Sequence, residues 1–124
     1  MEYTQYIYIT TNGDISIVDI PSEELSRRVH ELIDCELFEI VSLPNYGDLL
    51  MIVDETGKLT GKRCNPVASA VYPGTAYGDY IVGDVLIGKV CLKDGTYDVG
   101  GLMDPAANYF FKFFNLIKES YYGQ

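Results

Sequence analysis

The chain has 124 residues, of which 48% are hydrophobic and 22% are charged. This composition is typical of one globular domain and excludes intrinsic disorder, while no apolar run is long enough to span a membrane. The formal net charge of −9, from 9 basic and 18 acidic residues, argues against general nucleic-acid binding, in which cations must displace phosphate counterions. The polar start Met1–Gln5 lacks the pattern of a secretory signal. We therefore expect a single cytoplasmic domain over residues 1–124.

The first third of the chain predicts a β-hairpin followed by a helix. Residues 2–10 and 15–20 are rich in aromatic and β-branched side chains, which favour strands. Asn12-Gly13 lies between them, and this dipeptide is the strongest short-range hairpin signal. Residues 22–34 then place apolar side chains at helical spacing. This pattern predicts an amphipathic helix that packs on the sheet.

The middle of the chain predicts two strands and a short helix. Residues 36–43 alternate between polar and apolar side chains, as in a half-buried strand. Residues 49–54 form a continuous apolar run, which predicts a central strand covered on both faces. The stretch 59–78 is irregular except for a short helix expected over residues 66–72.

Strand character returns in residues 79–92, with a bend or bulge expected at Gly83-Asp84 because glycine weakens a strand interior. Asp94-Gly95 predicts a turn before a short strand around residues 97–99. Asp104-Pro105 then opens a helix over residues 105–122. The fold class is therefore α+β, with a mostly antiparallel twisted sheet.

The C-terminal helix carries apolar side chains around more than one side. One side holds Tyr109, Phe110, Phe113, Ile117 and Tyr121, and another holds Phe111, Phe114 and Tyr122. A helix with this pattern needs a second covering surface. It is either wedged between two layers or packed against its twin in a homodimer. We favour the homodimer, with Phe111, Phe114 and Tyr122 at the interface.

The motifs of common active sites do not occur in the sequence. There is no phosphate-binding loop, dinucleotide-binding glycine motif, zinc-protease motif or nucleophile elbow. His30 is the only histidine, and Cys35, Cys64 and Cys91 are too far apart in sequence for a disulfide framework or a zinc site. We therefore predict no catalytic residue, no metal ligand and no cofactor, and interpret the protein as a binder rather than an enzyme.

The best candidate for a binding site is the irregular region 61–84 together with the loop around Tyr46. Arginine grips phosphate, asparagine suits a base edge, and tyrosine offers a flat surface with a polar tip. The predicted ligand-binding residues are Arg63, Asn65, Tyr46, Tyr72 and Tyr80. The structural alternative for Asn65 is that it caps the short helix beginning at Pro66.

Four segments resemble one protein family. They are Phe38-Glu39-Ile40-Val41-x-Leu43, Leu50-Met51-Ile52-Val53-Asp54-Glu55-x-Gly57-Lys58-Leu59, Asn65-Pro66-x-Ala68-x-Ala70 and Ile81-Val82-Gly83-Asp84-Val85-Leu86-Ile87. In this order they resemble the family of domain of unknown function 3846, over about residues 5 to 120. Members occur mainly in phages, plasmids and other mobile elements of Gram-positive bacteria. The resemblance implies an accessory protein of a phage or mobile element, acting in the host bacterial cell, and it supplies no catalytic residue.

Three functions remain open on the sequence. The leading hypothesis is counter-defence by sequestering a small nucleotide-derived signal molecule. The first alternative is an acidic inhibitor of DNA-mimic type that binds a basic host protein such as a nuclease, since the net charge is −9. The second alternative is a small carboxylate-dependent nucleotide hydrolase. We expect neither direct nucleic-acid binding nor a membrane partner.

Overall fold

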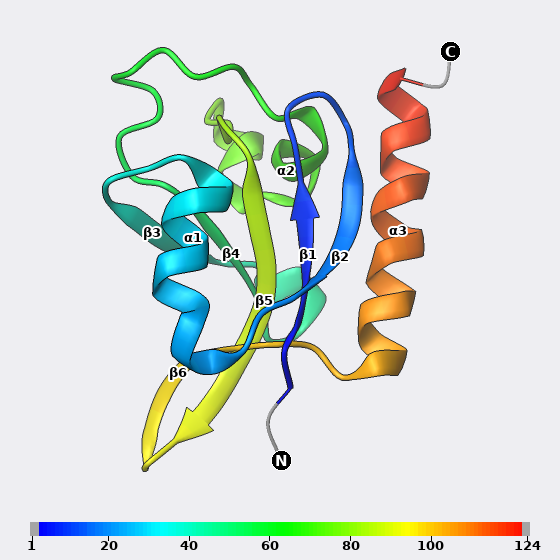
Figure 1. Cartoon of the computed structure of the whole chain (residues 1–124). Helices are drawn as coiled ribbons and strands as arrows, with labels where there is room; N and C mark the ends of the chain where they lie inside the picture. The colour runs from blue at the N-terminus through cyan, green and yellow to red at the C-terminus, as the bar shows by residue number, and fades with distance from the viewer. Residues whose placement is uncertain (1–2, 123–124) are drawn as a thin grey trace.

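A six-stranded antiparallel sheet carries helices on both faces in the computed structural model, which describes residues 3–122 (Figure 1). The strands are β1 (Gln5–Ile9), β2 (Ile15–Asp19), β3 (Phe38–Ser42), β4 (Leu49–Asp54), β5 (Val85–Lys93) and β6 (Thr96–Gly100). The helices are α1 (Leu25–Ile33), α2 (Pro66–Val71) and α3 (Asp104–Tyr122). The α+β class and the antiparallel sheet predicted from the sequence are thus confirmed.

The strand order is β2-β1-β5-β4-β3, and β6 pairs with β5 beside this path. All six residues of β4 are buried, because helices cover both faces of the sheet at this strand. β3 and β2 are the outer strands. The apolar run 49–54 therefore marks a central strand, as its composition predicts.

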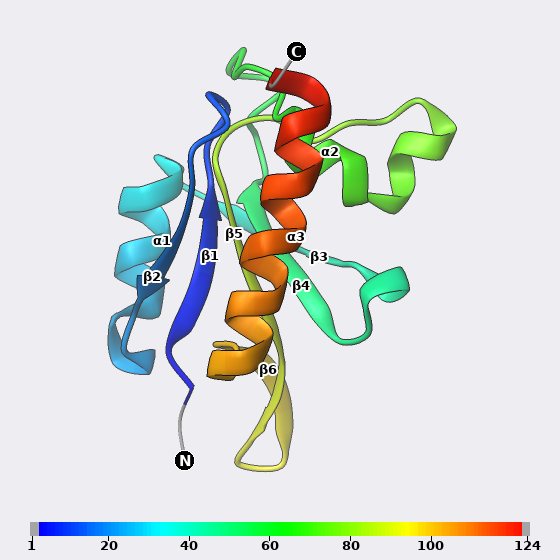
Figure 2. The same cartoon turned by 90° about the vertical axis from the view of Figure 1, so that its right-hand side faces the viewer.

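Each face of the sheet has its own hydrophobic core. α1 covers one face, where Val29 and Ile33 contact a cluster that includes Tyr6 and Leu86. α2 and α3 cover the opposite face, as the perpendicular view shows (Figure 2). Phe114 of α3 is buried in this second core.

Two predicted elements differ from the observed ones. The predicted helix 22–34 begins as a 3-10 turn over Ser22–Glu24 and becomes α-helical at Leu25. The predicted strand 79–92 begins only at Val85, because Ile81 is hydrogen-bonded to residues of the α2 segment through its amide and its carbonyl. Gly83, with φ +80°, then makes the expected bend.

α3 packs on one face of the sheet only (Figure 2), so the alternative in which it is wedged between two layers does not hold. Its outer side exposes Tyr109 and Leu116, each with 64% of its surface accessible. At its end, the Tyr122 hydroxyl donates a hydrogen bond of 3.0 Å to the Thr11 carbonyl at the tip of the β1–β2 hairpin.

Within residues 3–122, no helix combines the length and the hydropathy of a membrane span.

The edge of β5 that faces β1 is shared by two strands. Residues Val85–Ile87 pair with β1, whereas Lys89–Lys93 pair with β6. β1 and β5 separate where the partner changes, and the chain after β6 enters the gap. There the Gly101 amide donates to the Tyr3 carbonyl at 3.0 Å and the Leu102 amide donates to the Gln5 carbonyl at 2.7 Å. This fork in the sheet positions the candidate site.

Candidate functional site

Glycines make the fork possible, because backbones approach closely there. A Cβ atom on Gly101 would lie 2.4 Å from the Tyr3 carbonyl oxygen, and one on Gly88 would lie 2.7 Å from the Gly100 oxygen. A Cβ on Gly100 would lie 2.9 Å from the Cys91 sulfur. Backbone atoms thus exclude a side chain at Gly101 and Gly88, whereas at Gly100 the obstacle is the side chain of Cys91.

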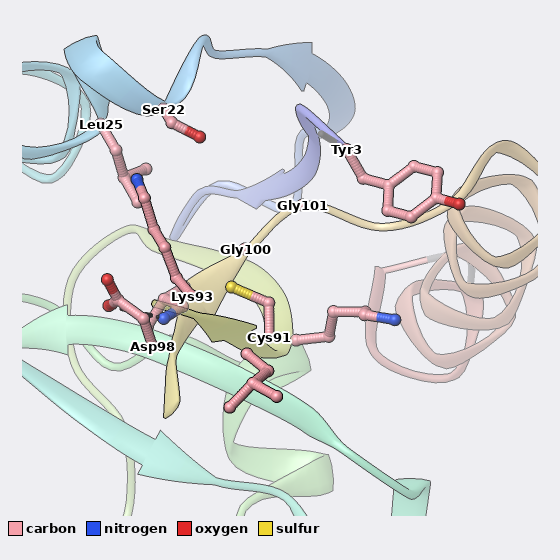
Figure 3. Close-up of a pocket in the computed structure, with 11 residues that line it drawn as sticks. Tyr3, Ser22, Leu25, Cys91, Lys93, Asp98, Gly100 and Gly101 are labelled. Carbon is pink, nitrogen blue, oxygen red and sulfur yellow. Dashed lines mark hydrogen bonds between the residues drawn. The ribbon is translucent and has the colours of Figure 1, made fainter. Parts of the chain in front are cut away.

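A pocket of about 230 Å³ lies at the fork, between the β5–β6 ladder and the start of α1 (Figure 3). Its polar lining comes from Tyr3, Ser22, Lys89, Cys91, Lys93 and Asp98. Figure 3 shows Ser22 and Leu25 on one side, Tyr3 on another, and the Cys91 thiol beside Gly100. We call this cavity the fork pocket.

The fork pocket carries positive charge in a strongly acidic chain. Lys89 and Lys93 line it, with Asp98 as the one acidic residue of the lining. The Lys89 ammonium lies 5.9 Å from the centre of the Tyr3 ring, and neither lysine forms an ion pair with any residue in the described part of the chain. Asp98 accepts a 2.7 Å hydrogen bond from the Val99 amide. The pocket is therefore suited to an anionic ligand.

A smaller recess of about 120 Å³ lies beside β3 and the end of β4. We call it the Tyr80 recess; its polar and aromatic lining includes Glu39, Glu55, Lys58, Tyr72, Asp79 and Tyr80. Asp79 is its centre, because it accepts hydrogen bonds from Lys58, from the Tyr72 hydroxyl at 2.8 Å and from the Tyr80 amide at 2.8 Å. These bonds lower the pKa of Asp79 to about 2, with the largest contribution from Lys58, the next from Tyr72 and the smallest from Tyr80.

The structure separates the five predicted ligand-binding residues. Tyr72 and Tyr80 share the Tyr80 recess. Arg63 instead donates a 3.1 Å hydrogen bond to Asn12 of the β1–β2 hairpin, and the Tyr46 ring packs 5.3 Å from the Phe113 ring of α3. No pocket joins the 61–84 segment to the Tyr46 loop among the cavities described above.

Asn65 has a structural role. It is fully buried, and its side-chain oxygen accepts a 3.2 Å hydrogen bond from the Ala68 amide, which caps α2. Its amide nitrogen donates to the carbonyls of Ile9 and Gly83. Because both the oxygen and the nitrogen of its side chain are hydrogen-bonded within the protein, Asn65 caps α2, as the structural alternative states, and has no group available to bind a ligand.

The predicted interface residues also lie in different surroundings. Phe114 is 0% exposed, so it belongs to the protomer core and presents no surface to a second copy. Phe111 is half-buried, and Tyr122 contacts the hairpin tip. The homodimer stays a prediction, and an interface on α3 would have to use its exposed Tyr109 and Leu116 side.

Two further features narrow the choice of site. A more open depression of about 410 Å³ near Leu102 is lined by Tyr3, Thr4, Gln5 and Asp104 among its polar residues, but Gln5 and Asp104 are hydrogen-bonded to each other at 2.6 Å and the lining has no basic residue. In the described residues 3–122, no three His, Cys, Asp or Glu side chains are grouped so as to hold a metal ion. The fork pocket thus remains the best candidate site.

Together, the fold and the fork pocket define a small α+β protein with an anion-suited cavity at a split in an antiparallel sheet. The chain belongs to the family of domain of unknown function 3846, whose model matches residues 4–114. No curated protein and no solved structure matches the chain. The family assignment thus confirms the resemblance seen in the sequence motifs.

Sequence reasoning missed the residues of the fork pocket. One signal was present: Lys89 and Cys91 alternate in the predicted strand 79–92 and Lys93 follows it directly, so in an extended chain the three side chains share one face. Two lysines on one strand face are notable in a chain with 9 basic and 18 acidic residues. Tyr3 and Ser22 gave no signal, because only the fold brings them to this strand.

Proposed function

We propose that this protein is a non-enzymatic binding module that sequesters a small phosphate-bearing molecule derived from a nucleotide, in the fork pocket. The observation that carries this proposal is the presence of Lys89 and Lys93, without carboxylate partners in the described chain, in one cavity of a protein with net charge −9. Charge-assisted hydrogen bonds from lysine are among the stronger contacts to phosphate.

The size of the fork pocket limits its ligand. Its volume of about 230 Å³ is below the roughly 300–1,000 Å³ of sites for drug-sized ligands. The pocket therefore suits a mononucleotide or a smaller phosphorylated fragment. The phosphate would lie near the lysines, and the Tyr3 ring offers a stacking surface for a base.

The resemblance to proteins of phages and mobile elements supports a biological context for this binding. Where a host uses a nucleotide to signal infection, a protein that binds this nucleotide would block the defence response. We infer counter-defence in the bacterial cytoplasm as that context. Sequestration, unlike hydrolysis, requires only that Lys89, Lys93 and Tyr3 hold the molecule.

Calorimetric titration with a ligand panel tests the proposal. The panel contains inorganic phosphate, nucleosides, nucleoside monophosphates, cyclic mononucleotides and cyclic ADP-ribose, and the titrated samples are examined for products by mass spectrometry. We expect binding of at least one phosphorylated compound and no binding of nucleosides. Product formation would support the hydrolase alternative instead.

Matched lysine variants locate the site. Lys93→Gln and Lys89→Gln should each weaken binding about tenfold, the loss expected for one hydrogen bond to a charged group. Lys112→Gln, an equal charge change on the exposed side of α3, should leave affinity nearly unchanged. Equal losses of affinity in all three variants would mean that only the net charge of the protein matters. If no compound of the panel binds, the proposal is wrong.

A further inference from the structure

The strand β3 forms an open edge of the sheet. Within the described chain its only strand partner is β4. Directly beyond the two ends of β3, the Leu43 amide donates to the Leu49 carbonyl and the Leu37 carbonyl accepts from the Glu55 amide. In an antiparallel pair, hydrogen-bonded residues alternate with residues whose amide and carbonyl groups point away. The odd-numbered residues therefore bond β4, and the backbone groups of Phe38, Ile40 and Ser42 face outward.

This edge is accessible and bordered by acidic residues. Ile40 is 47% exposed and Leu37 is 57% exposed, and the side chains of Glu36 and Glu39 are exposed as well. Exposed edges of this kind accept additional strands. The acidic border selects for a basic strand, because like charges on neighbouring strands are destabilising.

The Tyr80 recess adjoins the same edge, since Glu39 and Val41 of β3 line it. It already holds a cation: the Lys58 ammonium lies 4.6 Å from the centre of the Tyr80 ring and forms an ion pair with Asp79. Lys58 is the one basic residue of the lining. An aromatic face beside a carboxylate is a recognised cradle for ammonium and guanidinium groups.

The contact of Lys58 is a replaceable one. Its side chain is 46% exposed and that of Asp79 is 41% exposed, so the pair contributes little to stability. A cation from another molecule can therefore displace Lys58 without a large cost. Tyr80, itself 45% exposed, remains available to receive that cation.

We propose that the free edge of β3 and the Tyr80 recess together bind an extended segment of a partner protein that is rich in Arg or Lys. Main-chain hydrogen bonds to Phe38, Ile40 and Ser42 add the segment to the sheet. One basic side chain takes the place of Lys58 against Tyr80 and Asp79. This site is separate from the fork pocket and does not depend on the proposed nucleotide binding.

The test uses a fluorescent synthetic peptide that alternates Arg and Val, with a peptide that alternates Glu and Val as its charge-reversed control. Fluorescence anisotropy of the full chain should show binding of the Arg peptide only. Ile40→Pro removes an outward-facing amide, which an edge strand tolerates. It should weaken binding about tenfold or more while the circular dichroism spectrum is retained.

A second pair of variants tests the recess without changing the strand. Lys58→Gln removes the internal competitor and should tighten peptide binding about threefold or more, the range expected for one cation–π contact. Tyr80→Leu should weaken it by a similar factor. Lys112→Gln changes the net charge as Lys58→Gln does, at a site on α3.

The outcomes separate the possibilities. No binding of the Arg peptide, or equal effects of Lys58→Gln and Lys112→Gln, would overturn the proposal. Sedimentation of the protein alone serves as a further check. A concentration-dependent dimer that Ile40→Pro abolishes would show that a second copy occupies this edge, and would likewise overturn it.

Discussion

The Lys62 ammonium lies 2.8 Å from a carboxylate oxygen of Asp54, the last residue of the central strand β4. Lys62 also donates to the carbonyls of Ile33 and Asp34, where α1 ends. One side chain thus joins the end of β4 to the negative end of the helix dipole. The Asp54 side chain is only 3% exposed, so this ion pair is largely shielded from water.

Loss of Lys62 should destabilise the protein. Lys62→Met leaves the Asp54 carboxylate buried without its cation, which costs on the order of 3 kcal/mol in comparable ion pairs. Urea unfolding measures the change. Arg27→Met is the control, since Arg27 pairs with Glu24 and Glu31 on the exposed side of α1 and should cost less than about 1 kcal/mol. Equal losses in the two variants would contradict a special role for Lys62.

The same ion pair predicts how stability depends on pH in acid. Burial raises the pKa of the Asp54 carboxyl, but the hydrogen bonds from Lys62 and Thr56 outweigh burial, so the pKa lies below its ordinary value of 3.8. Above about pH 4 the stabilisation is complete. Below it, the unfolded chain takes up the proton first, and stability falls as the pH approaches the folded pKa.

Urea unfolding of wild type and Asp54→Asn between pH 7 and pH 2 checks this prediction. The variant should be less stable at neutral pH and should lose less stability on acidification. Asp79→Asn serves as a comparison, because Asp79 also has a lowered pKa but is exposed to solvent screening. Parallel curves for wild type and Asp54→Asn below pH 4 would refute the assignment.

Tyr8 predicts a corresponding effect in alkali. Burial, then the charge and hydrogen bond of Asp84, raise the pKa of Tyr8 from 10.0 to about 12. The unfolded tyrosine ionises first as the pH rises, so the stabilisation present below pH 10 is lost between 10 and 12. Tyr8→Phe should cost about 1 kcal/mol at neutral pH. It should also remove one late-titrating tyrosine from the ultraviolet absorbance titration; an unchanged titration curve would contradict the shift.

Asn65 should behave as a structural residue. Asn65→Ala removes the cap of α2 and both donors to Ile9 and Gly83, which should cost about 2–4 kcal/mol. Thermal unfolding measures this, and any phosphorylated ligand found by calorimetry should still bind the folded fraction. A stable variant without ligand binding would restore Asn65 to the binding site that the sequence suggested.

Gly100 and Gly101 of the fork should respond differently to alanine. Gly101→Ala places a Cβ 2.4 Å from the Tyr3 backbone oxygen, whereas Gly100→Ala meets the Cys91 sulfur at 2.9 Å. The backbone cannot move aside as a side chain can, so Gly101→Ala should cost about 2–3 kcal/mol and Gly100→Ala less. Cys91→Ala should partly restore stability to Gly100→Ala. If Gly100→Ala and Cys91→Ala have additive effects on the free energy of unfolding in urea, the contact between these two positions is wrong.

The sequence determined those elements whose information is local. The Asn12-Gly13 turn, the apolar run 49–54, the Asn65-Pro66 helix start and the Asp104-Pro105 helix opening all appear where their patterns predict them. Each depends on the backbone preference of one or two residues, or on burial at a fixed period, and both are written in neighbouring positions. The family motifs are equally local, and they sufficed to identify the family.

Tertiary structure decided which side chains meet. Nearness in the sequence groups Asn65 with Tyr72 and Tyr80, yet Asn65 is buried in the junction of α2, β1 and Gly83. Lys89 and Tyr3 are far apart in the chain, yet they line one pocket because the β5 edge passes from β1 to β6. Strand pairing over long separations depends on the packing of the whole sheet, which no short pattern encodes.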